Sequence, residues 1–364
     1  MILERLAMDA QEGGGKSLAP GTRLALRQYP AEGGAPFEIE VEPHGETTRI
    51  KARRDGRLVG AALARRAGEA LTLDISEPDI AAPRSVPIVA ALIASAFQHA
   101  PEAAAALVAD PAGAAALVPF AGAARLVDGV RFGVVERAVF HALPTLWRDA
   151  GAHVVYPLIR SRVGPLDRPP PLRPPKPSGM MYRRFIPGLG ELSLRPIDRR
   201  KDLALFHGWM NQKRVAFFWD MAQSEQELDA YLAAQEADAH TVGVIAALEG
   251  EPGAYLEFYW AKEDRLGAHY EAEDFDRGWH ALVGEPRFLG RARTLALFRS
   301  LTHYLFLDDP RTMRIVGEPR ASHVKILSYC EDVAYDRVKE FDFPHKRAML
   351  VMCERERFFD EVPV

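Results

Sequence analysis

The sequence predicts an α/β (α+β) protein of two domains, the second of which contains a mixed central sheet. The chain has 364 residues, which is long for a single hydrophobic core. Seven prolines fall between Arg160 and Gly179, where they remove backbone donors and favour extended chain. We therefore expect a smaller N-terminal α/β domain at 1–155, a proline-rich linker at 156–180 and a second domain at 181–364.

Composition and charge argue against several classes of partner. The formal net charge is −4 and no block of basic residues stands out, so no nucleic-acid partner is expected. The longest apolar run, Val86 to Phe97, is shorter than the ~20 residues that span a bilayer, so no membrane partner is expected. The chain start lacks the order of a signal peptide. The two cysteines, Cys330 and Cys353, make no disulfide framework, which favours a cytoplasmic location.

The first domain alternates short strand-like stretches with an alanine-rich middle. The strand-like stretches are TRLALRQY, FEIEVEP, TTRIKARRD and GRLVGAALARR. The alanine-dense stretch from Ala103 to Leu117 is predicted to be a helix packed on a sheet. Because no catalytic pattern occurs in this half, we expect a structural, oligomerising or substrate-shaping role, and a homodimer is compatible with it. A degenerate copy of the second domain is an alternative.

The second domain opens with a strand followed by helices. ELSLRPID (191–198) alternates apolar and polar residues, as a half-buried strand does. RKDLALFHGWMNQ (200–212) has helical spacing. Ser224 and Glu227 form an S-x-x-E capping box that begins the next helix. TVGVIAALEG and GAYLEFYWA are predicted to be two strands joined by a turn that contains Glu251, Pro252 and Gly253.

The remainder completes a regular succession. WHALVGEP is a strand candidate that leads into a helix over 291–307. The strand TMRIVGEP, the helix SHVKILSYCEDV and the strands VKEFDF and RAMLVMCE follow. The predicted order is β-α-α-β-β-β-α-β-α-β-β.

A small-residue loop lies between the WHALVGEP strand and its helix. The amides at a helix N-terminus lack intrahelical partners and attract a phosphate. Gly290 and Ala292 would let the backbone approach a pyrophosphate closely. Taken alone, the pattern from Arg287 to Ala292 favours an ordinary strand-to-helix turn, which often needs a small residue.

The position of this loop in the succession changes its interpretation. The pattern Gln/Arg-x-x-Gly-x-Gly/Ala after the fourth strand resembles the acetyl-CoA-binding motif of the GNAT N-acyltransferases. The resemblance covers about residues 181–357, and the sequence looks closest to the branch that acylates hydroxylamines in hydroxamate siderophore assembly. The segments that carry it are RPPKPSGMMYRRFIP, HGWMNQKRVAFFW, AYLEFYWAKEDRLG, DRGWHALVGEPRFLG, TMRIVGEPRASH and KEFDFPHKRAML.

The resemblance implies the GNAT acyltransferase fold and direct acyl transfer from acetyl-CoA or another acyl-CoA. The implied acceptor is an N-hydroxylated amine of the N6-hydroxylysine, N-hydroxyornithine or N-hydroxyputrescine type. An ordinary amine, such as an aminoglycoside or a polyamine, is an alternative acceptor, and a non-catalytic CoA-binding scaffold is a second alternative. The residues implied in binding acyl-CoA are Leu282, Val283, Arg287, Phe288, Leu289, Gly290, Arg291, Ala292 and Arg293.

The resemblance also implies catalytic residues. His280, in DRGWH, occupies the place of the relatives' catalytic histidine and is the first candidate for taking the proton, because an imidazole titrates near neutral pH; a structural histidine at a strand edge is the alternative. Relatives often have an acid in an E-P-D stretch after the next strand, whereas this chain has Glu318-Pro319-Arg320. Glu318 could supply a carboxylate or simply end the strand. Tyr329 is the candidate acid for the leaving thiolate, with core packing as its alternative.

Acceptor binding is expected from the helices after the first strand and from the lone acid of YLEFYW. A carboxylate and aromatic faces suit an acceptor that carries an ammonium group. The eleven histidines are scattered, and none stands at i, i+4 beside a glutamate, so no metal site is expected. His345, Lys346 and Arg347 fit a charged turn or a contact to CoA phosphates. The acceptor-binding candidates are Trp209, Asn211, Phe218, Trp219, Glu257 and Trp260.

Overall fold

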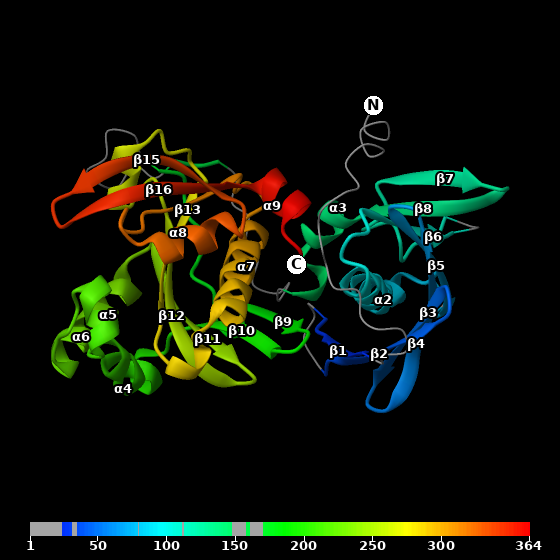
Figure 1. The fold of residues 1–364 in the computed structure, drawn as a ribbon, viewed down its shortest axis with the longest axis horizontal. Helices are drawn as coiled ribbons and strands as arrows, with labels where there is room; N and C mark the ends of the chain where they lie inside the picture. Colours follow the sequence, from blue (N-terminus) through cyan, green and yellow to red (C-terminus); the bar gives the residue numbers. More distant parts are fainter. Residues whose placement is uncertain (1–23, 31–34, 79, 111–112, 148–157, 161–169) are drawn as a thin grey trace.

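A computed structural model describes residues 24–30, 35–78, 80–110, 113–147, 158–160 and 170–364. Two units lie side by side, each built around an eight-stranded sheet (Figure 1). The start of the chain and much of the predicted linker lie outside the described residues. No helix within the described ranges is both long and apolar enough to cross a membrane.

The N-terminal unit wraps its sheet around one long helix, α2. Its elements are β1 (Leu24–Gln28), β2 (Phe37–His44), β3 (Thr47–Arg54), β4 (Arg57–Ala67), β5 (Ala70–Glu77), η1 (Pro83–Ser85), α2 (Val86–His99), β6 (Ala105–Ala109), β7 (Ala123–Val127), β8 (Val130–Glu136), α3 (Arg137–His141) and η2 (Pro144–Leu146).

The C-terminal unit has helices on both faces of its sheet. Its elements are β9 (Tyr182–Ile186), β10 (Gly190–Pro196), α4 (Arg199–Met210), α5 (Lys213–Trp219), α6 (Glu225–Ala237), β11 (Thr241–Leu248), β12 (Glu251–Trp260), η4 (Arg265–His269), β13 (Arg277–Val283), η5 (Pro286–Phe288), α7 (Arg291–Asp308), β14 (Arg314–Gly317), α8 (Val324–Glu331), β15 (Tyr335–Phe343), β16 (Lys346–Glu354) and α9 (Arg355–Glu361).

The two sheets share one topology. The orders are β1-β2-β3-β4-β5-β6-β8-β7 and β9-β10-β11-β12-β13-β14-β16-β15. In both, the first five strands are antiparallel, a long helix crosses to a parallel sixth strand, and the last two strands pair antiparallel. The units differ after the second strand, because β2 and β3 are joined by a tight turn whereas α4, α5 and α6 connect β10 to β11. The predicted mixed α+β sheet of the second domain is confirmed.

The alanine-rich middle of the first unit is not the predicted helix. Ala105–Ala109 forms strand β6, which pairs with β5 and β8 in the middle of the sheet. The helix is instead the apolar run Val86–His99, whose interior residues from Val89 to Phe97 are buried. A buried strand can be as alanine-rich as a helix, so composition alone misassigned the segment.

The second unit follows the predicted succession with local differences. Ser224 and Glu227 form the predicted capping box at the start of α6. The predicted turn at 251–253 is wrong: these residues belong to β12, and the chain turns at Glu249 and Gly250, which both have positive φ. A β-bulge beside Ala246 and Ala247 accommodates Pro252 within the ladder.

Buried polar contacts join the two units. The His303 side chain, on α7, lies 2.9 Å from the Tyr182 hydroxyl through Nδ1 and 2.7 Å from the His141 carbonyl through Nε2. The Arg183 amide donates to the Trp147 carbonyl at 3.0 Å. Helices α3 and α9 also pack against each other where the units meet (Figure 1). These contacts fix the second half of α7 against the N-terminal unit.

Candidate active site

Strands β12 and β13 bring the candidate site together. Glu257 on β12 is the cross-strand partner of His280 on β13, so both side chains lie on the same face of the sheet. Helices α4–α6 cover this face, while α7 covers the other. The ladder between β13 and β14 pairs only Arg277 with Ile315 and Gly278 with Val316. His280 therefore lies where these two parallel strands separate.

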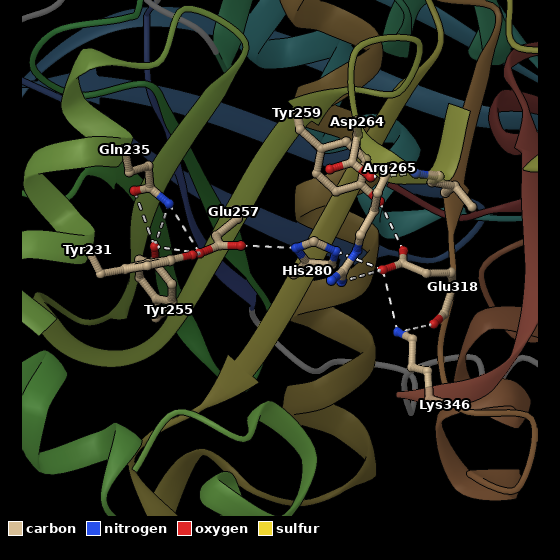
Figure 2. A network of polar contacts seen from close by, with 11 residues as sticks. Tyr231, Gln235, Tyr255, Glu257, Tyr259, Asp264, Arg265, His280, Glu318 and Lys346 are labelled. Carbon is tan, nitrogen blue, oxygen red and sulfur yellow. Dashed lines mark hydrogen bonds and ion pairs between the residues drawn. The ribbon is translucent and has the colours of Figure 1, made fainter. Parts of the chain in front are cut away.

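The imidazole of His280 bridges two carboxylates (Figure 2). Nδ1 lies 2.9 Å from Glu257 Oε2, and Nε2 lies 2.8 Å from Glu318 Oε1. Two carboxylate acceptors require both ring nitrogens to carry protons, so the ring is an imidazolium. Burial alone would lower the pKa of His280, but the charge of Glu318 and the hydrogen bonds to both carboxylates raise it to about 10.

Neutral donors surround the carboxylate of Glu257. Its Oε1 accepts hydrogen bonds from the hydroxyls of Tyr231 and Tyr255, the latter at 2.9 Å, and from Gln235 Nε2 at 3.1 Å. Gly243, opposite Glu257 on β11, leaves the space that Gln235 occupies. Burial alone would raise the pKa of Glu257, but the hydrogen bond and charge of His280 hold it below its ordinary value.

Cationic groups surround the carboxylate of Glu318. Lys346 Nζ donates to the Glu318 backbone carbonyl at 2.6 Å and lies 3.5 Å from Oε1. Arg265 reaches Oε1 at 3.4 Å, and the Tyr259 hydroxyl donates to Oε2 at 3.0 Å. Burial alone would raise the pKa of Glu318, but the charges of His280, Lys346 and Arg265 hold it far below its ordinary value.

His280 is the most exposed member of this carboxylate–histidine–carboxylate triad. Its side chain is 23% exposed, against 6% for Glu257 and 1% for Glu318. Trp219, at the end of α5, has its ring 6.2 Å from the imidazole. Phe218 stacks on His323 at 4.5 Å, which links α5 to the N-terminus of α8 beside the site. A molecule entering from this side meets His280 before either carboxylate.

The loop between β13 and α7 ends at Gly290, the N-cap of the helix. Gly290 has a φ of 118°, and the first amide with a partner in the helix is that of Thr294, which donates to the Gly290 carbonyl at 2.9 Å. The amides of Arg291, Ala292 and Arg293, at the start of α7, therefore have no acceptor within the helix. Arg291 pairs with Asp332 at 2.8 Å, so this end of the helix is also held to the region beyond α8.

The other predicted residues of this region lie around a small cavity, at the surface or in the core. Phe288 packs over Gly253, where a methyl group would collide with its ring. Val283, Phe288, Arg293 and the helix residue Leu297 line a small apolar cavity under the loop. Leu289 is 45% exposed. Outside that cavity, Arg287 pairs with Glu251 at 3.0 Å on the surface, and Leu282 packs in the core under α4.

Two residues of α4 and α5 brace the loop. Trp209 is buried, packs against Gly284 and donates from Nε1 to Glu285 Oε1 at 3.1 Å. Arg214 donates to the backbone carbonyls of Val283 and Gly284. Trp209, a predicted acceptor-binding residue, thus contacts the loop.

Three further predicted residues lie away from the triad. Asn211 donates its side-chain amide to the carbonyls of His207 and Gln223, at 3.0 and 2.9 Å, and so closes the end of α4. Trp260 lies near the far end of β12, with the guanidinium groups of Arg173 and Arg277 about its ring. Tyr329 is buried in the core on the α7 side, next to Phe298, as in its packing alternative.

Several residues of the site were not predicted from the sequence. Tyr231 and Gln235 come from α6, Tyr259 from β12 and Arg265 from η4. Lys346, expected in a charged turn or in contact with CoA phosphates, lies beside Glu318. The alternation of Tyr255, Glu257 and Tyr259 along one strand face was the signal that could have identified part of this set. Within the described residues, no group of histidine, cysteine and acidic side chains could hold a metal ion.

Comparisons with known proteins identify the family of the chain. A model described as an acetyltransferase (GNAT) domain matches residues 198–343. The chain is 39% identical over 243 residues to the N(6)-hydroxylysine O-acetyltransferase of Escherichia coli, covering 65% of this chain and 75% of that protein. It is 42% identical over 203 residues to the hydroxyornithine transacylase of Ajellomyces capsulatus, covering 54% of this chain and 46% of that protein.

A solved structure of an aminoglycoside acetyltransferase in complex with coenzyme A is 25% identical to this chain. The match covers 46% of this chain and 96% of the other, with a TM-score of 0.43. The chain spans less than half the length of the fungal transacylase and most of the length of the bacterial enzyme. The chain belongs to the GNAT acyltransferases, in the siderophore-biosynthesis branch that contains the hydroxylysine and hydroxyornithine acyltransferases.

Proposed function

We propose that this enzyme transfers an acyl group from acyl-CoA to the nitrogen of an N-hydroxylated amine and so forms a hydroxamate. The relatives named for hydroxylysine and hydroxyornithine support this acceptor class. The observation that carries the proposal is the triad, in which an accessible imidazolium is held between two buried carboxylates. A hydroxylamine nitrogen is less basic than an alkylamine nitrogen and enters the reaction uncharged at neutral pH.

In this scheme His280 acts first as an acid and then as a base. The nitrogen attacks the thioester carbonyl, the carbon–sulfur bond breaks, and the imidazolium gives its Nε2 proton to the departing sulfur. The newly acylated nitrogen then returns one proton to the neutral imidazole. The nitrogen loses one proton and the sulfur gains one, so the enzyme ends as it began. Glu257 keeps Nδ1 protonated throughout, and Tyr329 is not required as the acid.

The loop after β13 is the proposed acyl-CoA site. The amides of Arg291 to Arg293 at the start of α7 would bind the pyrophosphate, aided by the helix dipole. A backbone amide in the last residues of β13, at Leu282 or Val283, would polarise the thioester carbonyl. Trp209 and Arg214 would act by holding this loop in place. No residue in this scheme needs a metal ion.

The test is a measurement of thiol release from acetyl-, succinyl- and longer acyl-CoA. Each donor is offered with N6-hydroxylysine, N5-hydroxyornithine or N-hydroxyputrescine and, in parallel, with the unhydroxylated parent amine. We expect turnover on at least one hydroxylated acceptor and much slower turnover on its parent. Equal or faster turnover on the plain amines would refute the hydroxamate reaction. Binding of acyl-CoA without any turnover would instead favour a scaffold.

We also propose that the N-terminal unit is a degenerate copy of the catalytic unit, with the same strand order but without a second active site. The tight turn between β2 and β3 replaces the helices that cover the acceptor side of the catalytic sheet. Its role would be to support the catalytic unit. The two cysteines, Cys330 and Cys353, are free and buried, which suits the expected cytoplasmic location.

A further inference from the structure

Arg320 lies next to the triad on a well-fixed segment. The Pro319 carbonyl accepts from the Met349 amide at 2.9 Å, and the Ala321 amide donates to the Arg347 carbonyl at 3.0 Å. Arg320 itself bridges to Ala348, which packs in the core on the triad side of the sheet. Cross-strand partners project from the same face, so Arg320 lies on the face that carries Glu318.

The guanidinium of Arg320 has no acidic partner. Among the residues that the structure describes, no carboxylate lies within ion-pair distance of it, and its Nε is buried with no hydrogen-bond acceptor. The neighbouring cations differ in this respect, because Lys346 and Arg265 contact Glu318 and Arg347 pairs with Glu340 at 2.6 Å. A buried donor left without an acceptor costs free energy, which an anionic ligand would recover.

We propose that Arg320 binds the α-carboxylate of the acceptor, so that the acceptor is an N-hydroxylated α-amino acid and not a decarboxylated N-hydroxydiamine. This inference rests on the proposed function and names the substrate class of the same site. Arginine is suited to the task, because its planar guanidinium can donate two parallel hydrogen bonds to one carboxylate.

The spacing agrees with such an acceptor. Glu318 and Arg320 are two positions apart along an extended chain, which places their Cα atoms roughly 6–7 Å apart. In N6-hydroxylysine, the reacting nitrogen and the carboxylate carbon are six bonds apart, roughly 7 Å when extended. An acceptor with its nitrogen at His280 Nε2, where Glu318 now bonds, can therefore extend its carboxylate toward Arg320.

The same charges disfavour the diamine. N-hydroxycadaverine has the same carbon chain and nitrogen as N6-hydroxylysine but lacks the carboxylate, so it carries only a positive group at its far end. That ammonium would come near Arg320, and Arg265 and Lys346 are also cationic on this side of the triad. Selectivity would then arise both from attraction of the carboxylate and from repulsion of the ammonium.

The matched pair of acceptors provides the experiment. We would measure kcat/KM of the full-length enzyme for N6-hydroxylysine and for N-hydroxycadaverine, in wild type, Arg320→Gln and Arg320→Lys. We expect wild type to prefer hydroxylysine at least tenfold. Arg320→Gln should lower kcat/KM for hydroxylysine on the order of 10- to 100-fold, the usual effect of losing a charged hydrogen bond. Arg320→Gln should leave kcat/KM for N-hydroxycadaverine within about threefold of the wild-type value. Arg320→Lys should restore part of the kcat/KM lost for hydroxylysine.

Arg337→Gln is the matched control, because Arg337 is exposed and pairs with Glu331 at 2.7 Å. It should change neither substrate's kcat/KM. Equal use of both hydroxylated acceptors by wild type would overturn the inference, and this comparison needs no variant to fold. Equal losses on both acceptors in Arg320→Gln would also overturn it. If neither hydroxylated acceptor outperforms lysine or cadaverine, the proposed function itself fails, which is a separate result.

Discussion

The most informative perturbation is Glu257→Gln, which keeps the shape of the side chain and removes its charge. Glu257 touches His280 and otherwise neutral donors, so His280 is the group most affected. Two unit charges about 4 Å apart interact by about 4 kcal/mol at an effective dielectric constant of 20. That energy corresponds to about three pKa units. The pKa of His280, about 10 in the wild type, should therefore fall toward roughly 7 in the variant.

The shift has a defined effect on stability. The folded protein binds the His280 proton more tightly than the unfolded chain, whose histidine titrates near 6.5. The contribution of His280 to the free energy of unfolding is therefore complete below pH 6.5 and is lost as the pH rises toward 10. In Glu257→Gln this contribution should be lost within a narrow pH interval just above 6.5.

Two measurements check this prediction. Nitrogen-15 NMR of labelled histidine would follow the imidazole through its titration, with His280→Gln assigning the signal. Urea unfolding at pH 6.5, 8 and 9.5, compared with the same series for His280→Gln, would isolate the free-energy contribution. Tyr231→Phe is the control, because it removes a neutral hydrogen bond to Glu257 and should move the pKa of His280 much less. A wild-type His280 that titrates near 6.5 would refute the reasoning.

Three further predictions concern catalysis, the loop and a helix. His280→Gln should lower kcat by roughly 10²–10⁴ with any acyl-CoA that the wild type uses, the range for loss of acid–base catalysis, whereas His207→Gln on α4 should leave kcat unchanged; equal kcat in both variants would remove His280 from the mechanism. Gly290→Ala should raise KM for acyl-CoA and lower the Tm, since a φ of 118° strains any side chain, and an unchanged KM would separate the loop from CoA binding. Ser224→Ala should destabilise the protein by about 1 kcal/mol through loss of the α6 cap, measured by urea unfolding, and no change would mean that the capping box contributes nothing.

Local signals predicted the second unit well. Alternation in 191–198, the capping box at Ser224 and the apolar spacing after Gly290 each depend on near neighbours in sequence, and each element was found. The first unit was harder, since the alanines of β6 carry no periodicity that separates a buried strand from a helix. Strand β9 also escaped notice, because only its pairing with β10 distinguishes it from extended linker.

The site was only partly predictable because its contacts join residues that are distant in the chain. His280 and Glu257 were recognised separately, but their contact depends on the register between β12 and β13, which the sequence does not state. Lys346 and Arg265 reach Glu318 from a hairpin and a short helix distant in the chain. The carboxylates of Glu257 and Glu318 make His280 an imidazolium, so a histidine expected to titrate near neutral pH is charged at rest.

The buried His303 contacts have a mechanical consequence for the whole molecule. Helix α7 has 18 residues and is roughly 27 Å long. One end carries the proposed pyrophosphate amides, and His303, three turns away, is fastened to Tyr182 and to the carbonyl of His141 in the other unit. Helix α7 is thus held by the N-terminal unit at the end away from the proposed acyl-CoA site. Because the helix is rigid, a tilt of the N-terminal unit would displace the amides of Arg291 to Arg293, although the N-terminal residues lie far from the reacting atoms.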